Sequence, residues 1–214
     1  MLGKAFLLAI EGSIAVGKTS LARLITERLE ARLVLEDFQD NPFLEDFYRK
    51  PELYAFQTQL WFLLSRYRQQ QELQQIDLFA PLLVTDYMFM KDRIFASLTL
   101  NDREMILYDR VANLLEREVA MPDLVIYLQS DTDRLMANIK KRGRSYETGI
   151  DWNYLDSLNQ LYNEYFFRYT RSPLLIINTN DIDFVNSQSD FDEIITFIRK
   201  PVTGTRFFNP TRSF

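Results

Sequence analysis

The chain of 214 residues contains no cysteine and no histidine. A protein without cysteine forms neither a disulfide framework nor a thiolate metal site. The lack of histidine removes the commonest general base and the commonest metal ligand, so proton transfer near neutral pH must fall to a carboxylate, a lysine or a tyrosine. Long apolar runs are also missing, since no stretch approaches the roughly 20 residues of a membrane-spanning helix. We therefore expect no membrane partner.

The sequence also lacks a long stripe of basic residues. The formal net charge is −5, and no stripe of lysine and arginine interleaved with aromatics occurs. We therefore expect no polymeric nucleic acid as a partner, although a small anion can still be held locally. The first residues lead directly into an apolar run and leave no room for a signal peptide, so we expect a cytoplasmic protein. Hydrophobic residues at 47% and charged residues at 26% are typical of a globular domain.

What the sequence does contain is one uninterrupted match to the phosphate-binding pattern GxxxxGK[ST]. Ser20 follows the match, which reads Gly12, Ser13, Ile14, Ala15, Val16, Gly17, Lys18 and Thr19. An apolar run before it predicts a strand, and helical spacing after it predicts a helix. Backbone N–H groups of such a loop point at phosphate oxygens, while Lys18 reaches the β- and γ-phosphates and Thr19 ligates Mg²⁺. The pattern predicts a nucleoside-triphosphate site; a glycine-rich turn without function is the alternative.

Short apolar runs alternate with helical patterns along the chain. Strands are predicted at residues 5–10, 33–35, 81–86, 124–128 and 174–178, and the principal helices at 20–29, 53–75, 101–121, 131–139, 151–171 and 190–199. Continuous apolar strands are typical of a parallel sheet that is buried on both faces. We predict an α/β fold, a doubly wound parallel five-stranded sheet flanked by helices, in a single domain over residues 1–200. Residues 201–214 form a tail that either packs on this body or extends from it.

Two carboxylates follow predicted strands. Ligands of such sheets bind at the carboxyl ends of the strands, so Glu36, Asp86 and the phosphate loop should converge. An alcohol that accepts a phosphoryl group benefits from a nearby base, which suits Glu36, and Asp86 suits Mg²⁺. The alternative for each is an ordinary carboxylate that ends a strand or caps a helix.

After the fourth strand and its helix comes a basic stretch at residues 140–144, which read Lys-Lys-Arg-Gly-Arg. One interpretation is a helix C-terminus, where cations are favoured and Gly143 acts as the cap. The other is a lid over about residues 140–150, whose Arg142 and Arg144 close over the transferring phosphate. We favour the lid.

Taken together, these motifs resemble the deoxynucleoside kinase family, and the resemblance extends from the phosphate loop to Asn178. The motifs in order are residues 12–20, Glu36-Asp37-Phe38, residues 48–52 continuing to Gln59 and Ser65-Arg66, Asp86 followed by residues 92–96, and Arg142-Gly143-Arg144 followed by Glu147 and Gly149-Ile150. The resemblance implies a P-loop nucleoside kinase fold with an arginine-containing lid. Any one motif is weak evidence, whereas the ordered set is specific.

The family's roles transfer by position. Glu36 would accept the proton of the sugar 5′-hydroxyl, and Tyr48 with Glu147 would hydrogen-bond the 3′-hydroxyl. Gln59 would bind the base edge, because an amide offers both a donor and an acceptor. The alternative for Gln59 is a solvated helix residue.

Three further residues would complete the nucleoside pocket. Arg66 and Asp92 match the charged pair that contacts the rest of the base edge, and Phe95 matches the ring that lies against it. The alternatives are a surface ion pair for Arg66 and a core position for Phe95.

The sequence departs from the family at one place. The family has an arginine directly after the carboxylate of the third strand, whereas here Tyr87 follows Asp86. Lys91, Arg93 or the lid arginines are the candidates for the missing cation. Asn138 stands where some relatives have a further lid arginine. The Asp-Tyr variant resembles the bacterial purine branch, which favours deoxyadenosine or deoxyguanosine as the acceptor.

The resemblance implies ATP-dependent phosphorylation of the 5′-hydroxyl of a deoxynucleoside in nucleotide salvage, with Mg²⁺. A nucleoside-monophosphate kinase shares the fold but needs extra cations for the acceptor phosphate, and a nucleotide-binding module without catalysis is a further alternative. A GTP-dependent switch needs an Asn-Lys-x-Asp string, which is absent. Relatives are commonly dimers, and the aromatic residues of helix 151–171 lead us to expect a homodimer.

Overall fold

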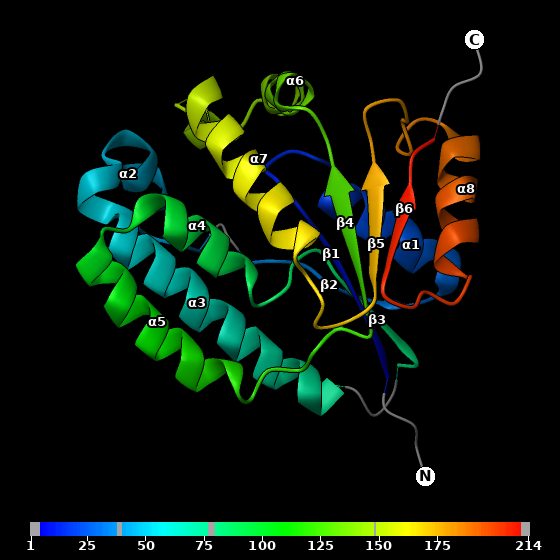
Figure 1. Cartoon of the computed structure of the whole chain (residues 1–214), viewed down its shortest axis with the longest axis horizontal. Helices are drawn as coiled ribbons and strands as arrows, with labels where there is room; N and C mark the ends of the chain where they lie inside the picture. Colours follow the sequence, from blue (N-terminus) through cyan, green and yellow to red (C-terminus); the bar gives the residue numbers. More distant parts are fainter. Residues whose placement is uncertain (1–4, 38–39, 77–79, 148, 211–214) are drawn as a thin grey trace.

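The protein is an α/β domain built on one parallel sheet (Figure 1). The computed structural model describes residues 5–37, 40–76, 80–147 and 149–210. The strands are β1 (Phe6–Gly12), β2 (Arg32–Val34), β3 (Leu82–Thr85), β4 (Leu124–Gln129), β5 (Leu174–Asn178) and β6 (Thr205–Phe208). The helices are α1 (Lys18–Leu29), α2 (Leu44–Arg49), α3 (Pro51–Ile76), α4 (Lys91–Thr99), α5 (Asp102–Glu116), α6 (Thr132–Arg142), α7 (Trp152–Phe167) and α8 (Gln188–Ile198), with a 3-10 turn η1 (Ser145–Glu147).

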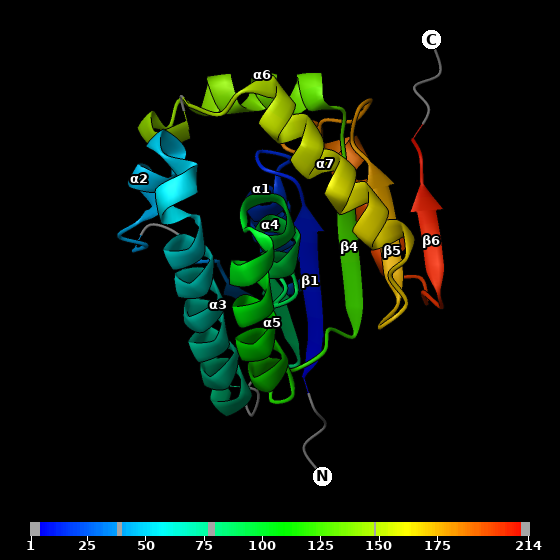
Figure 2. The ribbon, with the colours of Figure 1, turned by 60° about the vertical axis from the view of Figure 1, so that its left-hand side comes forward.

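The sheet lies between two helical layers, as the continuous apolar strands predicted. Alternate strand side chains point to opposite faces. Leu8, Ile126 and Ile177 pack with α1 and α8 on one face, whereas Val125 and Tyr127 pack with α7 on the other. Helices α3 and α5 lie outside α4, farther from the sheet (Figure 2). The strands β1, β3, β4 and β5 are thus buried on both faces.

The sheet has six strands in the order β2-β3-β1-β4-β5-β6, which corrects the prediction of five. The sixth strand comes from residues that we expected to form a tail, and it pairs parallel to β5. Phe208 is buried and its ring lies 4.3 Å from that of Phe197 on α8, while Phe207 is exposed. A four-residue edge strand with alternating burial lacks the continuous apolar run by which the other strands were found. Residues 211–214 of the tail, like Phe38 of the second motif, lie outside the described residues.

Helix α4 was not predicted from the sequence, although it carries site residues. Its buried side chains include the charged Lys91 and Asp92 beside Ile94 and Ala96. A helix whose inward face mixes charged and apolar residues has no simple apolar stripe, so periodicity does not reveal it.

The strand register brings the motifs to one edge of the sheet. Thr85 on β3 lies opposite Ala9 on β1 and Val34 on β2. Residues that follow these positions, which are the phosphate loop, Glu36 and Asp86, therefore leave the sheet on the same side. The predicted convergence at the carboxyl edge is confirmed.

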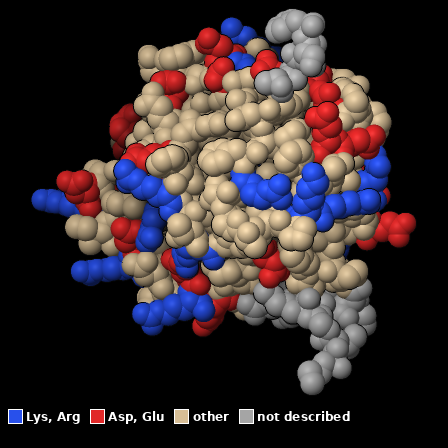
Figure 3. Space-filling view, turned by 45° about the vertical axis from the view of Figure 1, so that its right-hand side comes forward, with Lys and Arg blue, Asp and Glu red and all other residues tan. Residues whose placement is uncertain are grey.

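In the described part of the chain, no helix combines the length and apolarity that a membrane span requires. On the face drawn in Figure 3, charges of both signs are interspersed on a largely uncharged surface.

Candidate active site

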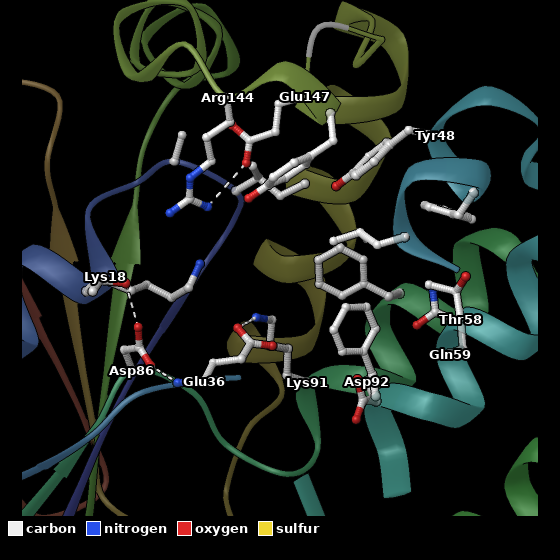
Figure 4. Close-up of a pocket in the computed structure, with 18 of the residues that line it drawn as sticks. Lys18, Glu36, Tyr48, Thr58, Gln59, Asp86, Lys91, Asp92, Arg144 and Glu147 are labelled. Carbon is white, nitrogen blue, oxygen red and sulfur yellow. Dashed lines mark hydrogen bonds and ion pairs between the residues drawn. The ribbon is translucent and has the colours of Figure 1, made fainter. Parts of the chain in front are cut away.

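A cavity of about 840 Å³, open to solvent, lies at this edge of the sheet. The residues that we proposed for chemistry, metal binding and nucleoside binding all line it: Lys18, Thr19, Glu36, Tyr48, Gln59, Arg66, Asp86, Asp92, Phe95, Arg142, Arg144 and Glu147. Lys18, Glu36 and Asp86 lie on the sheet side, whereas Gln59 projects from α3 on the opposite side (Figure 4). The cavity thus has a phosphate-loop end and a helical end.

The phosphate loop has the backbone that its glycines predict. Gly12 has a φ of 151°, and a Cβ there would lie 2.6 Å from the carbonyl oxygen of Leu128. Helix α1 begins at Lys18 without a side-chain cap, so the amide groups of its first turn remain available to an anion. The Lys18 ammonium donates to the carbonyl oxygens of Gly12 and Ser13 at 2.8 and 3.0 Å. Its donors are therefore held at the loop that phosphates would occupy.

Asp86 joins the loop to the segment after β2. One carboxylate oxygen accepts from the Thr19 hydroxyl at 2.5 Å, and the other accepts from the backbone N–H of Glu36 at 2.7 Å. Among the described residues, no group of three or more carboxylate, histidine or cysteine side chains that would hold a metal by itself occurs. A hydroxyl beside one carboxylate fits Mg²⁺, which prefers oxygen ligands and takes the rest from water and phosphate.

Glu36 lies between two cations. Arg66 contacts its Oε1, and the Lys91 ammonium lies 2.5 Å from its Oε2. Burial alone would raise the pKa of Glu36, but the charges of Arg66 and Lys91 outweigh burial and hold that pKa far below its usual range. Glu36 is therefore an ionised carboxylate that faces the cavity.

The helical end of the cavity carries buried polar atoms without partners. Gln59 is 2% exposed and Arg66 is 3% exposed, which excludes the solvated alternatives for both. The Gln59 amide nitrogen lies 3.4 Å from Thr99 Oγ1. Gln59 Oε1, Arg66 Nε and Asp92 Oδ2 have no hydrogen-bond partner among the described residues. Buried polar atoms are normally paired, so this set indicates a ligand with both donors and acceptors.

Phe95 lies both in the wall of the cavity and against the core, which are the two positions that we considered for it. It lines the cavity and packs edge-on against Tyr162 of the core, with ring centroids 6.1 Å apart. The Lys91 ammonium lies 5.6 Å from its ring centroid.

The basic stretch ends a helix and also faces the cavity. Gly143 caps α6 in the left-handed conformation, as the first interpretation required. Arg142 Nε donates to Glu147 at 3.0 Å, and Arg144 lies 3.5 Å from the same carboxylate. Glu147 is buried, and Tyr146 beside it stacks on Tyr48, with centroids 6.3 Å apart. In this structure the lid arginines are paired with Glu147.

The candidates for the cation that is missing after Asp86 differ in whether they contact Glu36. Lys91 reaches Glu36, while Arg93, two residues later on α4, pairs with Asp109 at 2.8 Å. The lid arginines are held by Glu147. Lys91 is therefore the candidate that the fold brings to Glu36.

Two residues at the phosphate loop were not proposed from the sequence. Glu11 is fully buried and accepts from the backbone N–H groups of Met88 at 2.7 Å and Gly12 at 3.1 Å. The sequence feature that could have identified Glu11 is a single carboxylate directly after the apolar run of the first strand. The Asn138 amide donates to the carbonyl of Ala15 at 3.0 Å, so the residue at the lid-arginine position secures the loop to α6.

Comparison with known proteins identifies the family. Residues 8–203 match the family model described as deoxynucleoside kinase. The chain belongs to the deoxynucleoside kinase family. This kinase is 29% identical to the deoxyguanosine kinase of Bacillus subtilis over 198 residues, which are 90% of this chain and 96% of the relative. It is 32% identical to the deoxyadenosine kinase of Dictyostelium discoideum over 207 residues, 94% of this chain and 81% of the relative.

Solved structures agree on the fold of the kinase. Deoxyadenosine kinase from M. mycoides with bound dATP has a TM-score of 0.80 at 24% identity, covering 91% of this chain and 100% of that chain. As a member of the deoxynucleoside kinase family, the protein transfers a phosphoryl group to a deoxynucleoside. The alternatives of a nucleoside-monophosphate kinase and of a binding module without catalysis are set aside.

Proposed function

We propose that this kinase phosphorylates the 5′-hydroxyl of a purine deoxynucleoside, deoxyadenosine or deoxyguanosine, with ATP and Mg²⁺ in nucleotide salvage. The observation that carries the proposal is the common cavity of Lys18, Glu36 and Gln59. A triphosphate at the loop and a base at Gln59 place the sugar hydroxyl near Glu36. The names of the relatives support a purine.

Glu36 is proposed as the base that accepts the proton of the 5′-hydroxyl. Phosphoryl transfer depends mainly on positioning and charge neutralisation, which Lys18, Arg142 and Arg144 supply around the phosphates. The lid arginines reach that position by exchanging Glu147 for phosphate oxygens. Thr19 and Asp86 would hold Mg²⁺, which offsets phosphate charge when it is bound.

The nucleoside is proposed to bind at the helical end. Gln59 contacts the base edge with both its donor and its acceptor, and the unpaired atoms of Arg66 and Asp92 contact the remainder. Phe95 lies against the ring. Tyr48 and Glu147, which line the cavity below the lid, bind the 3′-hydroxyl of the sugar.

We also propose that the enzyme is a cytoplasmic homodimer whose single catalytic domain includes β6. A cytoplasmic location suits an enzyme that draws on ATP and feeds the nucleotide pool. The homodimer is supported by exposed apolar surface on α7 and is tested below.

The proposal is tested by turnover with ATP, Mg²⁺ and each of the four deoxynucleosides, with the four deoxynucleoside monophosphates as competing acceptors. We expect deoxyadenosine or deoxyguanosine to give the highest kcat/KM. A preference for a pyrimidine would overturn the acceptor assignment, and a preference for monophosphates would overturn the 5′-hydroxyl chemistry.

The Gln59 assignment is tested by calorimetric binding of the preferred deoxynucleoside and of ATP. We expect Gln59→Ala to weaken nucleoside binding by about 10²-fold, because buried polar partners lose their hydrogen bonds. ATP binding should stay nearly unchanged. Gln57→Ala, an exposed neighbour on the same helix, is the matched control. Equal weakening of both ligands would contradict the assignment.

A further inference from the structure

Lys91 has a placement that stability does not explain. It is the first residue of α4 and is 6% exposed. A buried ammonium is costly to desolvate, and a cation at a helix N-terminus faces the positive end of the helix dipole. A position that is unfavourable on both counts indicates a function.

The partners of Lys91 lie in the cavity. Its ammonium contacts Oε2 of Glu36 at 2.5 Å and lines the same cavity as Lys18 (Figure 4). Arg66, on the other oxygen of Glu36, is also paired with Asp92. An ammonium has three donors, so Lys91 can keep Glu36 and still offer hydrogen bonds to a ligand.

We propose that Lys91 is a second phosphate-binding lysine of this kinase, a catalytic residue that binds the transferring phosphoryl group while it holds Glu36 in place. The proposal rests on the proposed role of Glu36 as the base. In the step, the bond between the 5′ oxygen and the γ-phosphorus forms as the bond from that phosphorus to the β,γ-bridging oxygen breaks. The hydroxyl proton passes to Glu36, and the electron pair leaves with the nucleoside diphosphate. Lys91 stays protonated and contributes only charge.

The arrangement of charges supports two lysines at one anion. The positive charge of Lys91 is near enough to Lys18 to lower the pKa of Lys18, in addition to burial. Glu11 on β1, Glu36 after β2 and Asp86 after β3 oppose that shift. Like charges held together among carboxylates fit a site that receives a multiply charged phosphate.

The test compares Lys91→Met and Lys91→Arg with Arg93→Met. Arg93 is the matched control, because it is a cation on the same helix that pairs with Asp109 and Asn113 away from Glu36. We expect Lys91→Met to lower kcat by about 10²–10³-fold, as loss of a group that stabilises transition-state charge does. Lys91→Arg should recover at least about a tenth of the activity, and Arg93→Met should stay within about twofold of the wild type.

A second readout separates catalysis from structure. Loss of charge stabilisation in the transition state lowers kcat without weakening the binding of the deoxynucleoside, so the KM for the deoxynucleoside should stay within about twofold of the wild type in Lys91→Met, Lys91→Arg and Arg93→Met. A structural role would instead lower the thermal midpoint and change kcat and KM together.

Two outcomes would overturn the proposal. One is a Lys91→Met enzyme with wild-type kcat. The other is a folded Lys91→Arg enzyme as slow as Lys91→Met, which keeps the test decisive where Lys91→Met does not fold. Glu36→Gln, assayed in parallel, distinguishes the two proposals. If Glu36→Gln is slow and Lys91→Met is not, only the role of Lys91 fails. If Glu36→Gln retains kcat, the assignment of the base fails.

Discussion

Glu36 is ionised because of its neighbours rather than because of solvent. Its side chain is only 11% exposed, and Arg66 and Lys91 hold its two oxygens. A base with so low a pKa accepts a proton only when the oxygen that gives it is becoming a phosphate ester. This favours proton transfer late in the reaction, which suits a dissociative phosphoryl transfer.

We predict that Glu36→Gln lowers kcat by about 10²–10⁴-fold, because the amide keeps the shape of the carboxylate but cannot accept the proton. Nucleoside binding should remain nearly intact. Steady-state kinetics and calorimetry measure the two quantities, with Glu45→Gln, an exposed carboxylate on α2, as the control. Loss of binding with kcat preserved would contradict the role of Glu36.

Lys18 gives the kinase a pH dependence. Its side chain is half-buried, and burial followed by the charge of Lys91 lowers its pKa to about 8. Lysine binds phosphate in its protonated form, so the charge is present below pH 8 and is lost as the pH rises through that value. We predict that kcat/KM for ATP declines above about pH 8.

Glu36 should add no limb to the acid side of the same profile. The pKa of Glu36 is held far below the usual carboxylate range, so Glu36 keeps its charge through mildly acidic pH. A decline that begins only near the ordinary pKa of lysine, about 10.4, would contradict the prediction for Lys18.

At the scale of elements, β6 and α8 close the edge of the sheet. Phe208 is 6% exposed and packs on Phe197, whereas the neighbouring Phe207 is 59% exposed. We predict that Phe208→Ala destabilises the fold by about 3 kcal/mol, because it leaves a cavity at the end of the core. Phe207→Ala should cost less than about 0.5 kcal/mol.

Denaturant unfolding followed by circular dichroism measures both variants. Their comparison isolates burial, since the two residues share a strand and a side-chain type. Equal destabilisation by the two substitutions would mean that β6 does not pack on α8 as the structure places it.

Helix α4 divides its charged residues between two surroundings. Lys91 and Asp92 face the cavity, whereas Arg93 faces α5 and pairs with Asp109. Successive residues on a helix point about 100° apart, so neighbours in sequence separate in space. The rotation of α4 about its own axis therefore decides which cation reaches Glu36.

At the scale of the whole molecule, the aromatic residues of α7 are mostly core. Tyr162 and Phe166 are buried and stack with Tyr127 of the sheet, which weakens the observation behind the expected dimer. Phe167 remains 82% exposed. An open groove between α4 and α7, which Phe167 does not line, includes Ile94 and the half-buried Tyr165.

We predict a homodimer in solution that uses this apolar face. Multi-angle light scattering should give twice the chain mass of 25.4 kDa. Phe167→Ser should shift the equilibrium toward the monomer, because it removes apolar area from an interface, while Phe207→Ser on the edge strand β6 should not. A monomer at every concentration would show that the expectation is wrong.

The prediction that polymeric nucleic acid is not a partner also belongs to this scale. It rests on the net charge of −5.

The main elements of the site follow from patterns in the amino-acid sequence. The phosphate loop is contiguous, and continuous apolar runs mark the strands β1, β3, β4 and β5. Parallel strands share a carboxyl edge, so the meeting of Glu36, Asp86 and Lys18 followed from strand positions alone. These features depend on local pattern and on one topological rule.

The pairings of charged side chains across the cavity do not follow from sequence patterns, because they depend on how the elements pack. Glu36 and Lys91 are 55 residues apart in sequence. Their contact depends on how α4 is rotated and packed relative to the sheet. The pairing of β6 with β5 likewise depends on how separate segments pack. Sequence periodicity reports which face of an element is apolar, but the partner of a buried charge is set by the three-dimensional arrangement of all the elements around it.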